Sequence, residues 1–250
     1  MHKLLVICGP TATGKTKLAA SLAKKFDGEL ISADSRQVYR GSDLETNKER
    51  PDVPIWLYDV AEQAQQFSVS HWVKLAREAI ADIGKRRKLP IVVGGTGFYI
   101  RALLNPFETI NMPPDKTLRA KNLTLAELQK MIHRGDMNDS DWNNPRRLIR
   151  KIETKKLKKR KHTNIYDYFA IGLTAPTQAL YKRIEEGLER RKRLGMRETG
   201  VNEHAIARHQ LTWFKKQPNI RWFDITEPDL VRQVTKKVSA WYTTSRRNEY

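Results

Sequence analysis

The sequence has very little cysteine and no long apolar stretch. Its single cysteine, Cys8, excludes an intramolecular disulfide and a zinc finger or knuckle built from thiols, because each needs more than one. No apolar run reaches the roughly 18 residues of a membrane-spanning helix, and residues 1–3 lead directly into a strand-like segment, unlike a signal peptide. We therefore expect a soluble, cytoplasmic protein without membrane contact. Cys8 lies in the apolar run LLVIC, which predicts a buried, inert thiol.

Acidic residues are scarce relative to basic ones. The 250 residues include 28 Asp and Glu against 47 Lys and Arg, a formal net charge of +19. This charge exceeds what solubility requires and indicates a polyanionic partner, with nucleic acid favoured over an anionic membrane surface. Residues 145–197 alone hold 17 basic and 5 acidic side chains. The length fits one compact enzyme, which we expect to be a monomer.

The first hundred residues alternate between strand-like and helix-like segments. Two strands are predicted at 3–8 and 29–33. The short continuous apolar run at 90–93 is typical of a parallel strand that is covered on both faces. Apolar residues recur at helical spacing over 18–26 and 72–83. This alternation predicts an α/β fold with a parallel sheet flanked by helices.

The middle of the chain has a different character. Residues 111–142 open with a proline pair, and Thr124 followed by Glu127 predicts a capping box at the start of a short helix. We expect 111–142 to be a small helical insertion that contacts the polyanion. Residues 1–110 and 143–250 would form the catalytic core, with a basic helical C-terminal part.

Residues 9–16 read GPTATGKT and match the motif G-x-x-x-x-G-K-[ST] between a strand and a helix. The motif predicts a P-loop NTPase-like core, in which backbone N–H groups and the helix N-terminus surround a diphosphate. It does not decide which diphosphate is bound. Lys15 would supply a positive charge, and the Thr16 hydroxyl would bind Mg²⁺. The candidate diphosphate-binding residues are Gly9, Pro10, Thr11, Ala12, Thr13, Gly14, Lys15 and Thr16.

The candidate acidic residue follows a different strand from the one that it follows in phosphate-loop kinases. The strand at 90–93 is followed by glycines, whereas a phosphate-loop kinase places a magnesium-binding aspartate there. The strand at 29–33 ends instead at Asp34, which could accept a proton from an attacking amine at the sheet edge where ligands bind. A helix cap is the alternative. Thr96 is a candidate donor to a leaving oxygen, with a plain tight turn as its alternative.

Five segments resemble, in the same order, the motifs of the tRNA dimethylallyltransferases, also called tRNA isopentenyltransferases. They are GPTATGKT at 9–16, DSRQVY at 34–39, GGTGFY at 94–99, NPRRLIRKIE at 144–153 and HQLTWF at 209–214. The resemblance implies an enzyme that uses Mg²⁺ and holds dimethylallyl diphosphate in the phosphate loop. The acceptor would be N6 of the adenosine just 3′ of the anticodon, flipped out of its stack.

The resemblance also implies roles for single residues. Asp34 would help to deprotonate the adenine amine, Thr96 would lie near the reacting centre, and Arg183 would reach the diphosphate. A solvated surface arginine is the alternative for Arg183. The residues implied to contact tRNA are Ser35, Arg36, Gln37, Arg146, Arg147, Leu148, Ile149, Arg150, Lys192, Arg193, Leu194, Gly195, Met196 and Arg197.

The second half departs from the family pattern. A Gly-Tyr-Arg element reads Gly-Met-Arg at 195–197, and a Thr-Arg-Gln triplet corresponds to Glu-His-Ala at 203–205. The segment 111–142 is also small for a domain that grips the anticodon stem. We expect the basic run at 155–161 to compensate through phosphate contacts.

Other functions share some of these features. A prenyltransferase acting on free adenine nucleotides would use the same loop and Asp34, but it needs no basic surface. A small-molecule or nucleoside kinase lacks its expected acid here, and a catalytically weak RNA-binding protein would keep the loop as scaffold. Isoprenoid synthases are disfavoured because the sequence has no Asp-Asp-x-x-Asp cluster.

Overall fold

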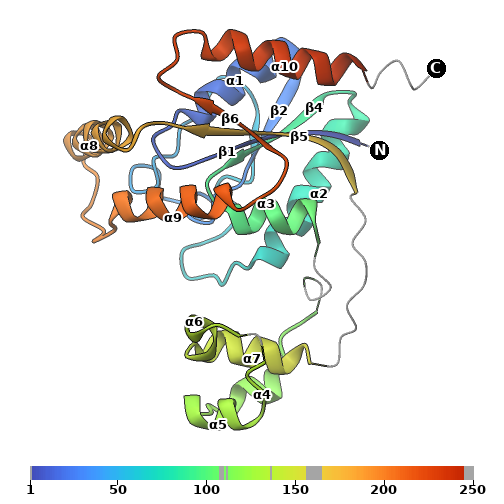
Figure 1. Cartoon of the computed structure of the whole chain (residues 1–250), viewed down its shortest axis with the longest axis vertical. Coiled ribbons are helices and arrows are strands. Elements are labelled where there is room, and N and C mark those ends of the chain that lie inside the picture. Colours follow the sequence, from blue (N-terminus) through green and yellow to red (C-terminus); the bar gives the residue numbers. More distant parts are fainter. Residues whose placement is uncertain (1, 107–109, 111, 136, 156–164, 245–250) are drawn as a thin grey trace. The chain divides into compact units, whose positions relative to one another are not determined.

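The computed structural model describes residues 2–106, 110, 112–135, 137–155 and 165–244 (Figure 1). These residues form two compact units. The larger comprises Met1–Asn105 and Asn164–Tyr250, and the smaller comprises Pro106–Thr163.

The larger unit is built on a six-stranded sheet, which confirms the α/β fold expected from the sequence. Its strands lie in the order β3-β2-β4-β1-β5-β6, and all neighbours pair in parallel. Cys8 at the end of β1 pairs with Gly94 of β4 and Gly172 of β5, so these strands end at one edge. The strands are β1 (His2–Cys8), β2 (Gly28–Ser32), β3 (Ile55–Trp56), β4 (Leu89–Gly94), β5 (Tyr166–Thr174) and β6 (Ile220–Asp224).

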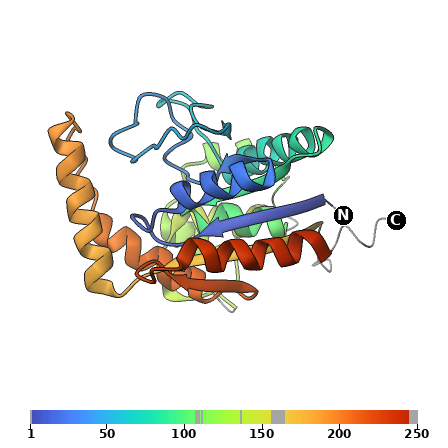
Figure 2. The same cartoon turned by 90° about the horizontal axis from the view of Figure 1, so that it is seen from above.

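Helices cover both faces of this sheet. In Figures 1 and 2, α1 and α10 lie on one face, while α2, α3 and α9 lie on the other. The helix α8 follows the carboxyl end of β5 and packs against α9. The helices of this unit are α1 (Lys15–Phe26), α2 (Val69–Lys85), α3 (Gly97–Leu104), α8 (Thr177–Arg193), α9 (Glu203–Lys215) and α10 (Leu230–Thr244).

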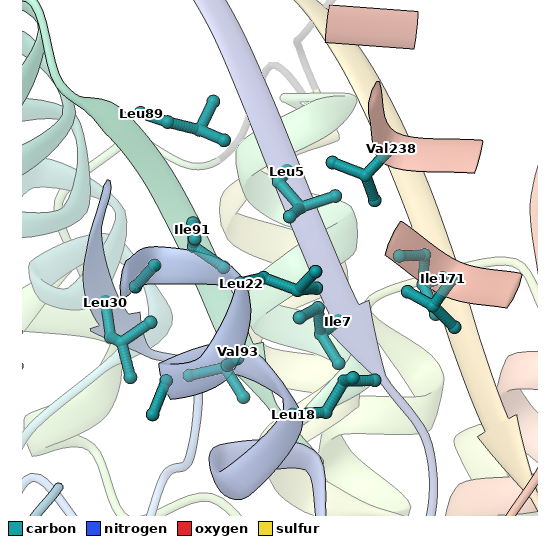
Figure 3. Packing of buried hydrophobic residues seen from close by; sticks show 14 of the residues in the cluster. Leu5, Ile7, Leu18, Leu22, Leu30, Leu89, Ile91, Val93, Ile171 and Val238 are labelled. Carbon is teal, nitrogen blue, oxygen red and sulfur yellow. The ribbon is translucent and has the colours of Figure 1, made fainter. Parts of the chain in front are cut away.

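Alternating side chains of the central strand β1 fill the core on both faces. Leu5 and Ile7 pack with Leu22 of α1 and Val238 of α10 (Figure 3). On the other face, α2 buries Trp72, whose indole Nε1 donates to the carbonyl oxygen of Ser32 at 2.8 Å. The tryptophan is therefore a core residue whose polar atom has a partner, as burial requires. The Cys8 thiol is buried too, and this burial raises its pKa to about 12.

The smaller unit is helical and has a core of its own. Leu128, Ile132 and Leu148 form its buried centre. The expected capping box is present, because Thr124 and Glu127 exchange hydrogen bonds at the start of α5. The helices are α4 (Lys116–Ala120), α5 (Leu125–Lys130), α6 (Asp139–Trp142) and α7 (Pro145–Glu153).

The structure places the boundary of this unit differently from the sequence expectation of 111–142. The helix α7 packs against α5 and α6, and it supplies Leu148 to their core. A helix that was expected in the catalytic core therefore belongs to the smaller unit, which spans 106–163. The C-terminal part is also more than helical, since β5 and β6 extend the sheet. Of the basic run at 155–161, residues 156–161 lie outside the described residues.

The described helices include none that is long and apolar enough to cross a membrane.

A buried carboxylate at the start of β2 joins three elements. The Glu29 side chain is 4% exposed and accepts hydrogen bonds from Arg86 Nη2 and Trp56 Nε1, each at 2.9 Å. The hydrogen bonds from the Arg86 guanidinium are the main cause that lowers the pKa of Glu29 from 4.5 to about 2. The ionised carboxylate therefore stabilises the folded chain.

We predict that Glu29→Gln lowers the free energy of unfolding by about 1–2 kcal/mol near neutral pH, a value reduced for the solvent exposure of Arg86. Because the folded pKa is depressed, the contribution of Glu29 is complete above pH 4.5 and disappears as the pH falls toward 2. Urea unfolding of both proteins at several pH values measures this. Asp27→Asn is the matched control, since Asp27 is 78% exposed. A gap between wild type and Glu29→Gln that is independent of pH would contradict the prediction.

Candidate active site

The loop between β1 and α1 has the backbone shape that the phosphate-loop motif predicts. Gly9 has φ 138°, and a Cβ there would lie 2.4 Å from the carbonyl oxygen of Leu173. Gly14 has φ 76° and is the N-cap of α1, so no side chain caps the first turn of that helix. The N–H groups of the turn, together with the helix dipole, therefore favour an anion at this point.

Lys15 is the cation nearest this loop. Its Nζ donates to the carbonyl oxygen of Pro10 at 2.6 Å. Burial lowers the pKa of Lys15 to about 8, against the opposing effect of the negative charges of Asp34 and Glu49. Near neutral pH most of this amine is already protonated, and an arriving anion would favour that charged form further.

Asp34 and Thr96 both lie at the carboxyl edge of the sheet, where Thr96 binds the two neighbours of Asp34 in the chain. The Thr96 hydroxyl accepts the backbone N–H of Ser35 at 2.9 Å. Asp34 Oδ1 accepts the N–H of Arg36 at 2.9 Å, which closes a turn directly after β2 and is not a helix cap. Close approach of β4 to β2 makes this possible, because a Cβ on Gly94 would lie 2.2 Å from the carbonyl oxygen of the residue before Asp34.

Asp34 and the phosphate loop share one cavity. This cavity, of about 70 Å³, is lined among others by Lys15, Thr16, Asp34, Tyr58 and Gln210. A larger hollow of about 770 Å³ lies next to it, between α1, residues 47–52 and α8, and also contacts Thr16. The expected catalytic carboxylate and the expected metal-binding hydroxyl therefore face the same small space.

The helix α8 brings Arg183 to the loop. Its Nε donates to the carbonyl oxygen of Ala12 at 2.9 Å, and its guanidinium lies beside Gly14. Arg183 also lines the larger hollow. Arg183 is exposed, so this position agrees with a diphosphate contact and leaves the alternative of a solvated surface arginine open.

Several residues that line the site could not be identified from a pattern in the sequence. Glu49 and Tyr58 come from the irregular stretch before α2, which has no periodic pattern. Burial, followed by the charge of Glu49, raises the pKa of Tyr58. Gln210 lies in the quoted segment HQLTWF, but its place in that segment was the only indication of a role.

The residues expected to touch the target nucleotide mainly support the neighbouring loop. Arg36 Nη2 donates to the carbonyl oxygen of Glu45 at 2.9 Å, and Gln37 Oε1 accepts from Ser32 Oγ at 3.0 Å. All three of Ser35, Arg36 and Gln37 are half-buried. Of the three, Gln37 lines the cavity, while much of their hydrogen bonding is used within the protein.

The expected tRNA contacts at 146–150 all lie in the smaller unit. Arg146 and Arg147 are exposed, whereas Leu148 is fully buried and serves the core. Arg150 Nη1 pairs with Glu153 at 2.8 Å, and Ile149 packs at the edge of the same core. Arg147 pairs with Asp141, so among the described residues of 146–150 Arg146 is the exposed arginine without an ion pair.

The expected contacts at 192–197 comprise the last two residues of α8 and the four that follow it. Lys192, Arg193, Leu194 and Arg197 are exposed, and Gly195 has φ 92°. The Met196 sulfur accepts from Arg191 Nη1 at 3.6 Å. This exposed basic segment is available to a partner.

Comparison with known proteins decides the family. Residues 37–199 match the family model described as IPP transferase. A tRNA dimethylallyltransferase of Bacillus cytotoxicus is 33% identical over 300 aligned positions, covering 95% of each chain. One from Geobacillus thermodenitrificans is 34% identical and covers 91% of this chain and 92% of its own. The chain belongs to the tRNA dimethylallyltransferase family.

A solved structure of this family agrees in fold. The full-length tRNA isopentenylpyrophosphate transferase from Bacillus halodurans is 30% identical and matches with a TM-score of 0.72, covering 100% of both chains. The alignment with the Bacillus cytotoxicus enzyme spans 300 positions, more than the 250 residues of this chain. That enzyme therefore contains segments that are missing here. The chain is thus a shortened member of the tRNA dimethylallyltransferase family, and an enzyme of the transferase class.

The lowered pKa of Lys15 predicts how diphosphate binding depends on pH. We expect the affinity for a simple alkyl diphosphate, whose own protons are lost below this range, to fall as the pH rises through about 8, because binding must then protonate the amine. Isothermal titration calorimetry from about pH 7 to pH 9.5 measures this. Lys15→Arg is the matched control, because arginine stays charged and its affinity should remain flat. A flat profile for both proteins would contradict the prediction.

Proposed function

We propose that the chain transfers a dimethylallyl group from dimethylallyl diphosphate to N6 of the adenosine 3′-adjacent to the anticodon in tRNA. One observation carries the proposal: Asp34 and the phosphate loop face the same cavity, and Thr96 binds Ser35, the residue after Asp34. A carboxylate next to a diphosphate site suits the alkylation of an amine, because that reaction releases both a diphosphate and a proton. Family membership supplies the reaction class.

The phosphate loop would stabilise the leaving group. When the allylic C–O bond breaks, its electron pair stays on the diphosphate and negative charge grows there. Lys15 and Arg183 both contact the loop, and together with the loop N–H groups they would oppose this charge. Among the described residues no group of three or more His, Cys, Asp or Glu gathers, so Mg²⁺ would be held by the Thr16 hydroxyl and the diphosphate oxygens themselves. When bound, Mg²⁺ would supply further charge stabilisation.

Asp34 would act on the acceptor side. The N6 nitrogen forms the new bond to the allylic carbon, and the proton that it loses passes to the Asp34 carboxylate. One oxygen of Asp34 is oriented by the N–H of Arg36. Thr96, held by Ser35, lies at the same edge and would contact the reacting groups.

We further propose that the basic surface binds the anticodon stem-loop. Within the described residues, exposed cations at 192–197 and on α7 are available for phosphates. The unit at 106–163 would contribute to this contact, and the enzyme would act as a monomer in the cytoplasm, where its substrate is used.

The first experiment tests transfer directly. We expect purified protein with Mg²⁺ and labelled dimethylallyl diphosphate to label unmodified tRNA and not AMP. Asp34→Asn should lower the transfer rate by about 10²–10⁴-fold, since the amide keeps the acceptor for Arg36 but cannot take a proton. Asp82→Asn, on the exposed side of α2, is the matched control. Label on AMP would instead support a nucleotide prenyltransferase, and label on neither would refute the proposal.

The basic segment predicts a change in salt dependence. Replacing Lys192 and Arg197 together by alanine should weaken tRNA binding and reduce the slope of log K against log salt by about 1.5, because each lost phosphate contact removes about 0.7–0.9. Filter binding at several salt concentrations measures the slope. The matched control replaces Lys236 and Lys237, exposed on α10. Equal slopes for the two double variants would show that the segment at 192–197 does not touch tRNA.

A further inference from the structure

One side chain joins two parts of the site that are far apart in sequence. Gln210 of α9 accepts the backbone N–H of Thr11 on its Oε1 at 2.9 Å. Its Nε2 donates to the carbonyl oxygen of Gly95 at 3.1 Å. Because one partner can only donate and the other can only accept, the two contacts also fix which way the amide points.

Each partner belongs to a different half of the reaction. Thr11 lies in the phosphate loop, which would hold the donor. Gly95 precedes Thr96, and the Thr96 hydroxyl accepts the N–H of Ser35, the neighbour of Asp34. A short chain of hydrogen bonds therefore runs from the diphosphate side, through Gln210, to the side that takes the acceptor.

The helix that carries Gln210 is itself held in place. At Gly97 the Trp213 ring of α9 fills the space of a side chain, since a Cβ would lie 2.1 Å from it. At the start of α9, Glu203 pairs with the buried Arg191 of α8 at 2.7 Å. Gln210 thus stands on a helix that is fixed at both ends against α3 and α8, and it can set a distance between the two loops.

We propose that Gln210 is a positioning residue that fixes the phosphate loop relative to the Thr96 turn. It would thereby set the separation of the allylic carbon and the attacking amine. Transfer between two bound reactants requires contact within about 3–3.5 Å, so a small shift of one loop slows the reaction without releasing either substrate. This inference rests on the proposed function and deepens it.

The test separates binding from transfer. For Gln210→Leu we expect the single-turnover rate at saturating tRNA and dimethylallyl diphosphate to fall at least about 10-fold. The dissociation constants for inorganic pyrophosphate and for tRNA should each change less than about threefold. Gln217→Leu is the matched control, because the Gln217 side chain also hydrogen-bonds backbone but does not line the cavity shared by Asp34 and the phosphate loop. An unchanged rate, or a pyrophosphate affinity that weakens as much as the rate falls, would overturn the proposal.

A second variant gives a signature that a purely structural role would not show. Gln210→Glu keeps an acceptor for Thr11, but its carboxylate faces the Gly95 oxygen and cannot donate unless it is protonated. We expect the ratio of its rate to the wild-type rate to rise as the pH falls from about 8 to 5, toward the carboxyl pKa of about 4.3. A ratio that does not change with pH would overturn the proposal, also if Gln210→Leu failed to fold. Absence of transfer by wild type would instead refute the proposed function.

Discussion

Parallel pairing around β1 is the constraint on which the rest of the site depends. Because β1, β4 and β5 are in register, the chain leaves all three strands at one edge. Backbone hydrogen bonds then continue past the strand ends, from Ala33 N–H to Val93 and from Thr96 N–H to Ala33. Asp34 and Thr96 are therefore placed by the sheet and not by a loose loop, which is how a site gains precision from its scaffold.

The sequence allowed the phosphate loop, the first strands and the helix caps to be predicted, because each has a local pattern that physics makes necessary. The second half was harder to interpret. In β5 the stretch YDYFAIGLT begins with polar and aromatic residues and lacks the long apolar run of β1. The boundary at 106–163 depends on where Leu148 packs, and the role of Gln210 depends on two distant backbone groups. Such contacts between residues far apart in the chain cannot be predicted from the spacing of apolar residues.

Charge is divided between interior and surface in a consistent way. The buried cation Lys48 pairs with Asp59, and buried Arg191 pairs with Glu203. In the smaller unit the buried Glu153 lies between Arg119 and Arg150. Interior charges are thus matched, as their desolvation requires, whereas the excess positive charge remains in exposed segments. Within the described residues, the buried charges therefore contribute little to the net charge of +19, and the excess positive charge lies on the surface, where it can bind a polyanion.

The position of Gln210 determines how late in synthesis the active site can be completed. A ribosome completes the phosphate loop early, yet one edge of β1 stays unpaired until residues 166–174 have emerged, and open strand edges invite aggregation. The link from Thr11 to Gly95 forms later still, with α9. A prematurely terminated chain would carry the diphosphate loop without the side chain that aligns it, so interrupted synthesis yields fragments that lack a complete active site.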